Sequence, residues 1–218
     1  MTPVEILGWA GALAAISIGI PQAVRLLRTR STAGLAVLTW QLLLGLNIGW
    51  FGHGILIEAP NMVVPNVFSA VVSATVLLLI RSARGLNPVT ILIPTALIAA
   101  VMIGADLIGG STAFGVVALL GSLIANAGQA INLVRSPDVS GVAPGYLIAQ
   151  LVNQVLWVTW GFAVSDSGTI LSSISTGLVI VFSTIWWLLR RAGLRPLFVR
   201  AESVGVVSGQ AAPVSSRP

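Results

Sequence analysis

The sequence predicts an all-α membrane protein of seven transmembrane helices, arranged as two parallel three-helix bundles joined by one linking helix. Three observations predict it: a low content of charged residues, seven apolar stretches of membrane-crossing length, and an internal repeat. Of the 218 residues, 56% are hydrophobic and 8% are charged, whereas an average soluble domain carries about 25% charged residues. So few charges do not cover a water-facing surface of this size, which places the chain in a lipid bilayer.

The apolar stretches set the expected helices, because about 20 residues of helix cross a hydrocarbon core of about 30 Å. They lie at 6–27, 37–57, 63–81, 89–109, 113–134, 143–164 and 169–189. Segments rich in Gly, Pro, Ser, Asn and Asp separate them, as expected of turns. The first stretch has no basic residues before it and no small-residue cleavage site, so we expect a retained helix rather than a signal peptide.

In this arrangement of helices, the arginines and most of the acidic residues fall on opposite sides of the membrane. All the arginines follow the first, third, fifth or seventh stretch: Arg25, Arg28, Arg30, Arg81, Arg84, Arg135, Arg190, Arg191, Arg195, Arg200 and Arg217. Glu5, Glu58, Asp106 and Asp166 fall on the other side. Because arginine is retained on the cytoplasmic side, we expect a multi-pass protein of the bacterial inner (plasma) membrane, with the N-terminus outside and the C-terminus cytoplasmic. The basic balance then reflects orientation, and no nucleic acid is expected as a partner.

An internal repeat divides the chain. Shifting the sequence by 107 positions aligns residues 21–54 with residues 128–161. The identical pairs include Gln, Arg and Trp, which seldom match by chance in an apolar chain. Each copy covers three helices, so the single helix between them gives both copies the same orientation, a plan that places a transporter's substrate site near the midplane between the halves.

This repeat sets the expected domains. The first bundle covers 1–84, the linking helix 85–111 and the second bundle 112–191. Residues 192–218 are rich in Ser, Gly, Ala, Pro and Val, which predicts a disordered cytoplasmic tail.

The repeated motifs resemble a known family. Pro21-Gln22 lies near the end of the first helix and precedes a basic loop that ends in Ser31-Thr32-Ala33-Gly34, while Gly128-Gln129 occupies the same place in the second copy. These motifs resemble the signature of the PQ-loop clan. With the two-repeat plan, residues 5–190 resemble the SWEET-like sugar transporters. The clan also includes exporters of cystine or cationic amino acids and a sorting receptor, so fold alone does not select the substrate.

Candidate substrate-binding residues lie on the second and sixth helices. Asn47 and Trp50 are three residues apart and Asn153 and Trp157 are four apart, so each pair shares a helix face. Amides that bind hydroxyls beneath an indole that stacks on C–H faces would suit a sugar, although interfacial anchoring also explains the tryptophans.

The family resemblance adds further positions. It implies that the two tryptophans flank the pocket and that Asn66 and its repeat partner Ser173 line it. It also implies hinge or gate roles for Pro21 and Pro144. The matched amides of Gln22 and Gln129 could gate the path, contact substrate, or bond neighbouring helices.

Two residues are candidates for proton coupling. His53 is the sole histidine, and Asp138 lies in the loop before the sixth helix. Structural roles are the alternatives: an interfacial histidine and a turn-capping aspartate. The helices carry no carboxylate at mid-depth, where proton relays usually lie, which favours passive facilitation.

These features predict a transporter that facilitates movement of a small polar solute, with a sugar as the first expectation, by alternating access between two bundles. The alternatives are a proton-coupled amino-acid exporter and a non-transporting membrane receptor or scaffold. With no cysteine, no metal cluster and no catalytic constellation, we expect neither an enzyme nor a bound cofactor or metal. The expected partners are the solute and the lipid bilayer, and a homo-oligomer is allowed but not required.

Overall fold

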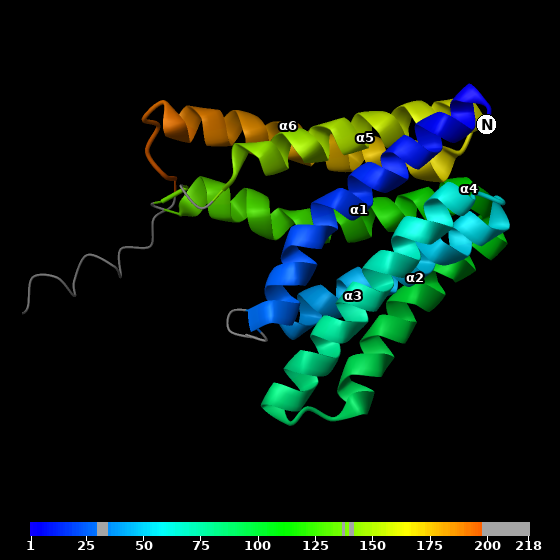
Figure 1. Ribbon diagram of the computed structural model, residues 1–218, viewed down its shortest axis with the longest axis horizontal. Helices are drawn as coiled ribbons and strands as arrows, with labels where there is room; N and C mark the ends of the chain where they lie inside the picture. The colour runs from blue at the N-terminus through cyan, green and yellow to red at the C-terminus, as the bar shows by residue number, and fades with distance from the viewer. Residues whose placement is uncertain (30–34, 137, 140–141, 198–218) are drawn as a thin grey trace, which may run out of the picture.

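A computed structural model of the protein describes residues 1–29, 35–136, 138–139 and 142–197, and within its helices the side chains of 21, 22, 25–27, 129 and 132 also lie outside the description. The described residues form six helices and no strand (Figure 1): α1 (Pro3–Thr29), α2 (Val37–Leu56), α3 (Pro60–Arg84), α4 (Pro88–Arg135), α5 (Pro144–Val164) and α6 (Ser167–Arg191). The all-α prediction is confirmed.

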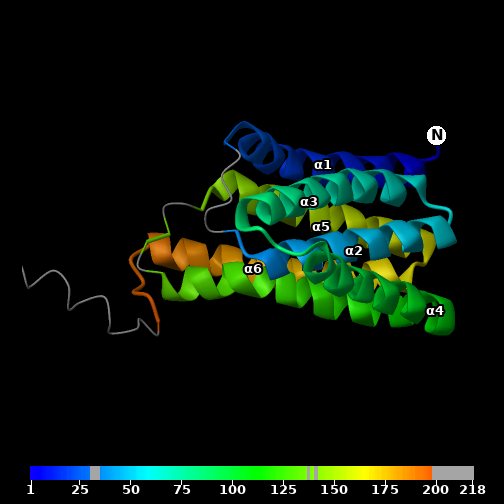
Figure 2. The ribbon, with the colours of Figure 1, turned by 90° about the horizontal axis from the view of Figure 1, so that it is seen from below.

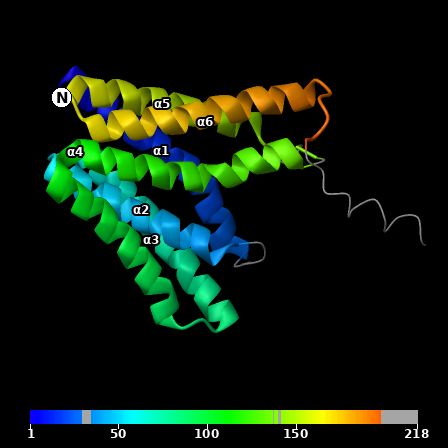
Figure 3. The same cartoon turned by 180° about the vertical axis from the view of Figure 1, so that it is seen from behind.

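The longest element, α4, is broken at Gly110. This residue has φ 67° and ψ −170°, a conformation that is essentially confined to glycine. The chain turns back there, so α4 consists of a first arm (88–109) and a second arm (111–135) that run away from the same point (Figures 1 and 3). The two arms cover the ranges predicted for the fourth and fifth helices.

α1, α3, α4 and α6 extend one to three residues beyond the predicted apolar stretches, and α2 and α5 match theirs to within one residue. Proline occupies the first turn of α3 and α5, where its missing N–H costs no helical hydrogen bond. Gly85 ends α3 in the left-handed conformation with φ 63°, as is usual for a glycine after a helix. Of the predicted tail, residues 192–197 follow α6 without helix, and 198–218 lie outside the described residues.

The two ends of the molecule differ. At the end that holds the N-terminus, called here the N-terminal end, the α2–α3 link, the turn between the two arms of α4 and the α5–α6 link lie close together (Figures 1 and 3). At the opposite end, called here the splayed end, the α3–α4 link lies apart from the end of α6. Viewed from below, α1 and α3 lie on one side, α4 and α6 on the other, and α2 and α5 between them (Figure 2).

Five of the described helices, α1, α3, α4, α5 and α6, are long and apolar enough to cross a membrane. α2 is 20 residues long and carries three polar side chains, Gln41, Asn47 and His53. Many large apolar side chains face outward, such as Ile108, which is 90% exposed. Outward apolar side chains suit a lipid environment.

A buried amide compensates for a proline in the first arm of α4. Pro94 has no N–H, so the carbonyl of Thr90, four residues earlier, loses its helical donor. The Gln41 side chain of α2 donates Nε2–H to this carbonyl oxygen at 2.7 Å. The polar residue within α2 therefore completes the hydrogen bonding of its neighbour.

Glycines bring α2 close to the first arm of α4. Gly45 and Gly49 are four residues apart on one face of α2, the spacing that lets membrane helices approach each other. A Cβ atom added at Gly45 would lie 2.7 Å from Ile98 Cβ and 3.0 Å from the Thr95 carbonyl oxygen. Neither atom is the end of a flexible side chain, so the contact cannot relax cheaply.

We therefore expect Gly45→Ala to lower the free energy of unfolding by about 1–3 kcal/mol, as overpacked cores do. Thermal unfolding in detergent measures this. Gly104→Ala is the matched control, because a Cβ at Gly104 meets no atom within 4 Å and alanine favours the helix. Equal unfolding temperatures for wild type and Gly45→Ala would contradict the close packing.

Candidate functional site

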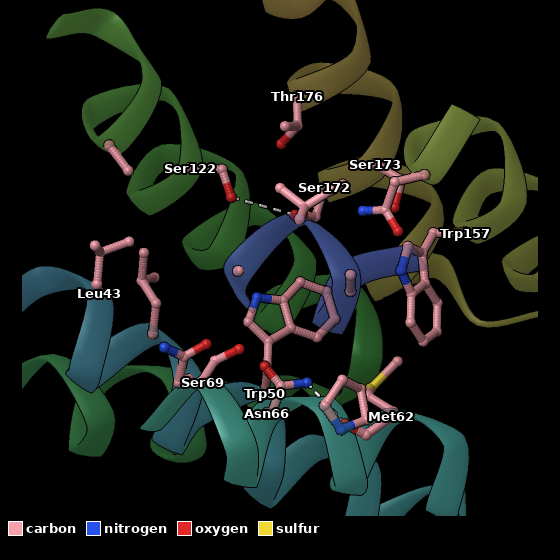
Figure 4. Close-up of a pocket in the computed structure, with 18 of the residues that line it drawn as sticks. Leu43, Trp50, Met62, Asn66, Ser69, Ser122, Trp157, Ser172, Ser173 and Thr176 are labelled. Carbon is pink, nitrogen blue, oxygen red and sulfur yellow. Dashed lines mark hydrogen bonds between the residues drawn. The ribbon is translucent and has the colours of Figure 1, made fainter. Parts of the chain in front are cut away.

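A cavity of about 410 Å³ lies among the helices, and all six helices contribute residues to its lining (Figure 4). All the residues predicted to bind substrate line this one cavity: Asn47, Trp50, Asn66, Asn153, Trp157 and Ser173. The structure thus brings together side chains from α2, α3, α5 and α6. Their role in binding stays a prediction.

Aromatic neighbours fix the two repeat-related tryptophans of the cavity, Trp50 and Trp157. The Trp50 ring meets Phe114 edge to face, with ring centroids 4.8 Å apart. The Trp157 ring meets Trp160 in the same way at 5.6 Å. Trp157 also packs against α1, where a Cβ atom added at Gly11 would lie only 3.2 Å from the indole. Gly11 therefore makes room for this side chain.

Local hydrogen bonds orient the amides of the lining. Asn66 donates Nδ2–H to the Met62 carbonyl oxygen at 2.8 Å, one turn earlier in α3. Asn126, in the second arm of α4, bonds the Ser122 carbonyl oxygen in the same manner at 2.8 Å. Each amide is held by its own helix while its side chain lines the cavity.

The lining that the structure describes mixes apolar and polar side chains and carries no charge. It contains Asn, Gln, Ser, Thr and Trp side chains and no Asp, Glu, Arg or His. An ionic solute would therefore find no counter-ion there.

The two halves of the lining differ in polarity. Most described lining residues pair with another lining residue 107 positions away, as Trp50 does with Trp157. In several pairs the first-half residue is apolar and the second-half residue is polar, and no described lining pair shows the reverse. These pairs are Ala15 with Ser122, Gly19 with Asn126, Leu43 with Gln150, Leu46 with Asn153, Met62 with Thr169, and Pro65 with Ser172.

Sequence reasoning missed most of these polar residues. Thr169, Ser172, Ser173 and Thr176 share one face of α6 because they are three or four residues apart, and all four line the cavity. The signal was present in the repeat alignment, where apolar residues of the first copy become polar in the second. It could not be used without knowing which helix face lines the cavity.

The predicted hinge residues are only partly visible. Pro21, Gln22 and Gln129 lie in helical backbone, but their side chains lie outside the described residues. Pro144 is exposed in the first turn of α5, where it starts a helix and interrupts none. Its hinge role stays a prediction.

The two candidates for proton coupling lie at opposite ends of the molecule. Asp138 is exposed in the α4–α5 link at the splayed end. His53 lies in the last turns of α2 at the N-terminal end and is fully buried. The structure does not bring the two residues into one site.

His53 instead lies between two buried carboxylates. Its Nδ1 is 2.6 Å from Asp106 Oδ2, in the first arm of α4, and its Nε2 is 3.2 Å from Asp166 Oδ2, at the start of α6. We call these three residues the Asp–His–Asp cluster. The imidazole also stacks on Phe114, with ring centroids 4.0 Å apart.

The cluster adds a feature that the sequence did not predict. Asp106 and Asp166 fall at the ends of apolar stretches, away from the described arginines, and they are only 8% and 5% exposed. The protein therefore contains buried acids at its N-terminal end, although none lines the cavity.

Asp166 also caps α6. Its carboxylate accepts hydrogen bonds from the Thr169 backbone N–H at 2.8 Å and from the Ser111 hydroxyl. Burial raises the pKa of this carboxyl, but the hydrogen bonds from His53, Ser111 and Thr169 outweigh burial and hold the pKa well below its usual value. The ionised form is thus part of the folded structure.

Comparison with known proteins shows the fold. No protein-family model matches the chain, and no curated protein matches its sequence. Among solved structures, the chain is similar to a eukaryotic SWEET transporter, with a TM-score of 0.67 and 14% sequence identity, covering 88% of this chain and 100% of that chain. At this identity the likeness concerns the fold alone.

The chain therefore has a SWEET-like fold. With its several helices able to cross a membrane, this fold is that of a multi-pass membrane protein. The similar structure is described as a transporter, and the absence of enzymatic activity in this chain stays a prediction.

The lowered pKa of Asp166 predicts a pH-dependent stability. Its ionised carboxylate contributes fully at pH values above the ordinary pKa of about 4, and the contribution is lost as the pH falls from there toward the lowered pKa. We expect Asp166→Asn to reduce the free energy of unfolding by about 3 kcal/mol at neutral pH, and the difference from wild type to shrink in acid. Thermal unfolding of both proteins across this range checks it, and equal stability at neutral pH would contradict the assignment.

Proposed function

We propose that the chain is a transporter that facilitates movement of a small neutral polar solute, with a sugar as the first candidate, by alternating access between two three-helix bundles. The observation that carries this proposal is the uncharged cavity of about 410 Å³ that holds both repeat-related tryptophans and four asparagines. Cavities of roughly 300–1,000 Å³ are typical of small-molecule sites.

The chemistry of the lining favours a neutral solute. A charged group that leaves water without a partner pays a large desolvation cost, and no described lining residue offers a charge. Indole rings provide apolar faces and one N–H donor each, while amides and hydroxyls both donate and accept. A molecule with several hydroxyls and apolar C–H faces matches both sets of groups.

The topology supports two bundles. If the two arms of α4 are separate crossings, the chain has seven, and the first arm links the bundle α1–α3 to a second bundle made of the other arm, α5 and α6. The described arginines in the last turns of α1, α3, α4 and α6 lie at the splayed end, which we assign to the cytoplasm of a bacterium by the positive-inside rule.

The cavity is closed toward the N-terminal end. Along α2 its lining runs from Trp50 to Trp40, roughly 15 Å at the rise of an α-helix, and Trp40 is within one turn of the splayed end of α2. Beyond Trp50, toward the N-terminal end, lies the fully buried His53. In the proposed orientation this is a cytoplasm-facing state.

Uptake into proteoliposomes tests the proposal. We expect entry of labelled glucose or sucrose without need of a pH gradient, and a loss of about tenfold in Asn66→Ala or Trp157→Ala, since one buried hydrogen bond or ring contact contributes about 1–1.5 kcal/mol. Ile108→Ala, at an exposed outward position, is the control and should transport as wild type does.

Other results would redirect the assignment. Unchanged uptake of every tested solute after substitution of both Trp50 and Trp157 would overturn the cavity as the binding site. Amino-acid flux that follows a proton gradient would favour the exporter alternative. No flux of any solute would favour a receptor or scaffold.

The unequal polarity of the cavity predicts how the solute is oriented. Because the second half supplies most of the hydrogen-bonding groups, we expect Gln150→Leu to reduce sugar uptake several-fold. Leu43→Gln, the reciprocal change at the paired position, should have a much smaller effect. A deoxy sugar that lacks one hydroxyl should lose less of its binding in Gln150→Leu than the parent sugar does. Competition of each sugar against uptake of labelled glucose measures this. Equal effects of the two substitutions would show that polarity of the halves does not orient the solute.

A further inference from the structure

The Asp–His–Asp cluster fastens three elements at the N-terminal end. His53 belongs to α2, Asp106 to the first arm of α4, and Asp166 to the start of α6. Ser111 follows the break at Gly110, and its hydroxyl donates to Asp166 and accepts from the Gly168 backbone N–H at 2.7 Å. The contacts therefore cross between the two halves of the chain.

The geometry of the cluster indicates that both ring nitrogens of His53 carry a proton. A carboxylate only accepts hydrogen bonds, and a neutral imidazole has a single N–H. Both ring nitrogens of His53 lie within hydrogen-bond distance of a carboxylate oxygen, at 2.6 and 3.2 Å. Both contacts are satisfied when each nitrogen carries hydrogen. Loss of one proton places a lone pair against a carboxylate and leaves two negative charges buried beside a neutral ring.

Within the described part of the chain, no other charged group compensates that loss. The titratable groups that face His53 from α4 and α6 are Asp106 and Asp166, and α3 brings apolar residues such as Met62 to this end. Glu5 and Glu58 are exposed at the same end. The described arginines follow their helices at the splayed end.

The cluster lies directly beyond the cavity. Trp50 lines the cavity and meets the His53 ring edge to face, with centroids 5.9 Å apart. Thr169 also lines the cavity, and its backbone N–H donates to the same Asp166 oxygen that lies near His53. A path from the cavity to the N-terminal end that runs between α2 and the start of α6 would separate His53 from Asp166.

The repeat shows that this titratable contact has an apolar counterpart. The positions 107 residues away from His53 and Asp166 are Trp160 and Ala59. These two residues pack together with Met62 in a buried apolar cluster. Of the two equivalent contacts between the halves at this end, one can change its charge and the other cannot.

The carboxylates contact opposite nitrogens of the ring, so the three side chains do not converge on one point as metal ligands do. No group of three or more His, Asp or Glu among the described residues is arranged to hold a metal ion.

We propose that the Asp–His–Asp cluster is a proton-binding site that keeps the N-terminal end of the cavity closed, and that release of its proton allows this end to open. The proposal rests on the proposed function, in which that end opens during transport. Access to the cavity from the N-terminal side then increases as the pH rises.

Cysteine labelling tests the proposal without a transport assay, because the chain contains no cysteine. Ala125→Cys places one thiol in the cavity lining, and a membrane-impermeant thiol reagent is added on the N-terminal side of oriented proteoliposomes from pH 6 to 8.5. Glu58→Cys, at an exposed position, gives the reference rate that corrects for ionisation of the thiol itself.

We expect the corrected rate to rise about tenfold over this range in the wild-type background. It should be independent of pH in His53→Gln, whose neutral amide takes up no proton, and in Asp166→Asn. Trp160→Phe changes the apolar counterpart and should keep the rise. If His53→Gln does not fold, as judged by gel filtration in detergent, Asp106→Asn replaces it in the comparison.

A flat wild-type profile, or the same rise in wild type and in the cluster variants, would overturn the proposal. The two proposals fail separately. Labelling that depends on pH, in a protein that moves no solute, would remove the transport function and keep the proton site. Sugar flux together with a labelling rate that does not depend on pH would keep the transport function and remove the proton site.

Discussion

In a bilayer, a polar group that leaves water must find its partner inside the protein, and this constraint shapes the whole molecule. Gln41 occupies an apolar helix because Pro94 frees the Thr90 carbonyl that the amide bonds at 2.7 Å. Asn66 bonds the carbonyl of its own helix. In the cavity, several polar side chains from different helices face one open space, which makes it the candidate binding site.

The same constraint is met differently at the two ends. At the N-terminal end the partners are charged side chains, His53 with Asp106 and Asp166, which lose much of their mutual stabilisation if one charge is removed. At the splayed end Arg190 donates to the backbone carbonyl oxygens of Leu133 and Ser136, at 3.2 and 2.7 Å. These acceptors carry no titratable charge. The contact at the N-terminal end can respond to a proton, whereas hydrogen bonds to these two backbone carbonyls cannot.

Most of the fold could be predicted because its signals are local. Apolar stretches located the helices, and the repeat matched Trp50 with Trp157 before any contact was known. The burial of Asp106 and Asp166 could not be predicted, because it depends on His53, whose distance along the chain from either residue gives no local pattern. The polar residues of α6 are evident in the sequence, but only the packing of the helices shows that Thr169 and Thr176 line the cavity.

The polarity difference between the halves has a consequence for how such a protein changes over time. A cavity formed by two identical chains about a two-fold axis repeats every side chain, so one mutation alters both walls at once. Here Leu43 and Gln150 occupy equivalent positions within one chain and can diverge independently. Selectivity can therefore be adjusted one wall at a time, and a duplicated gene can reach solutes with two unlike faces that a symmetric ancestor would hold poorly.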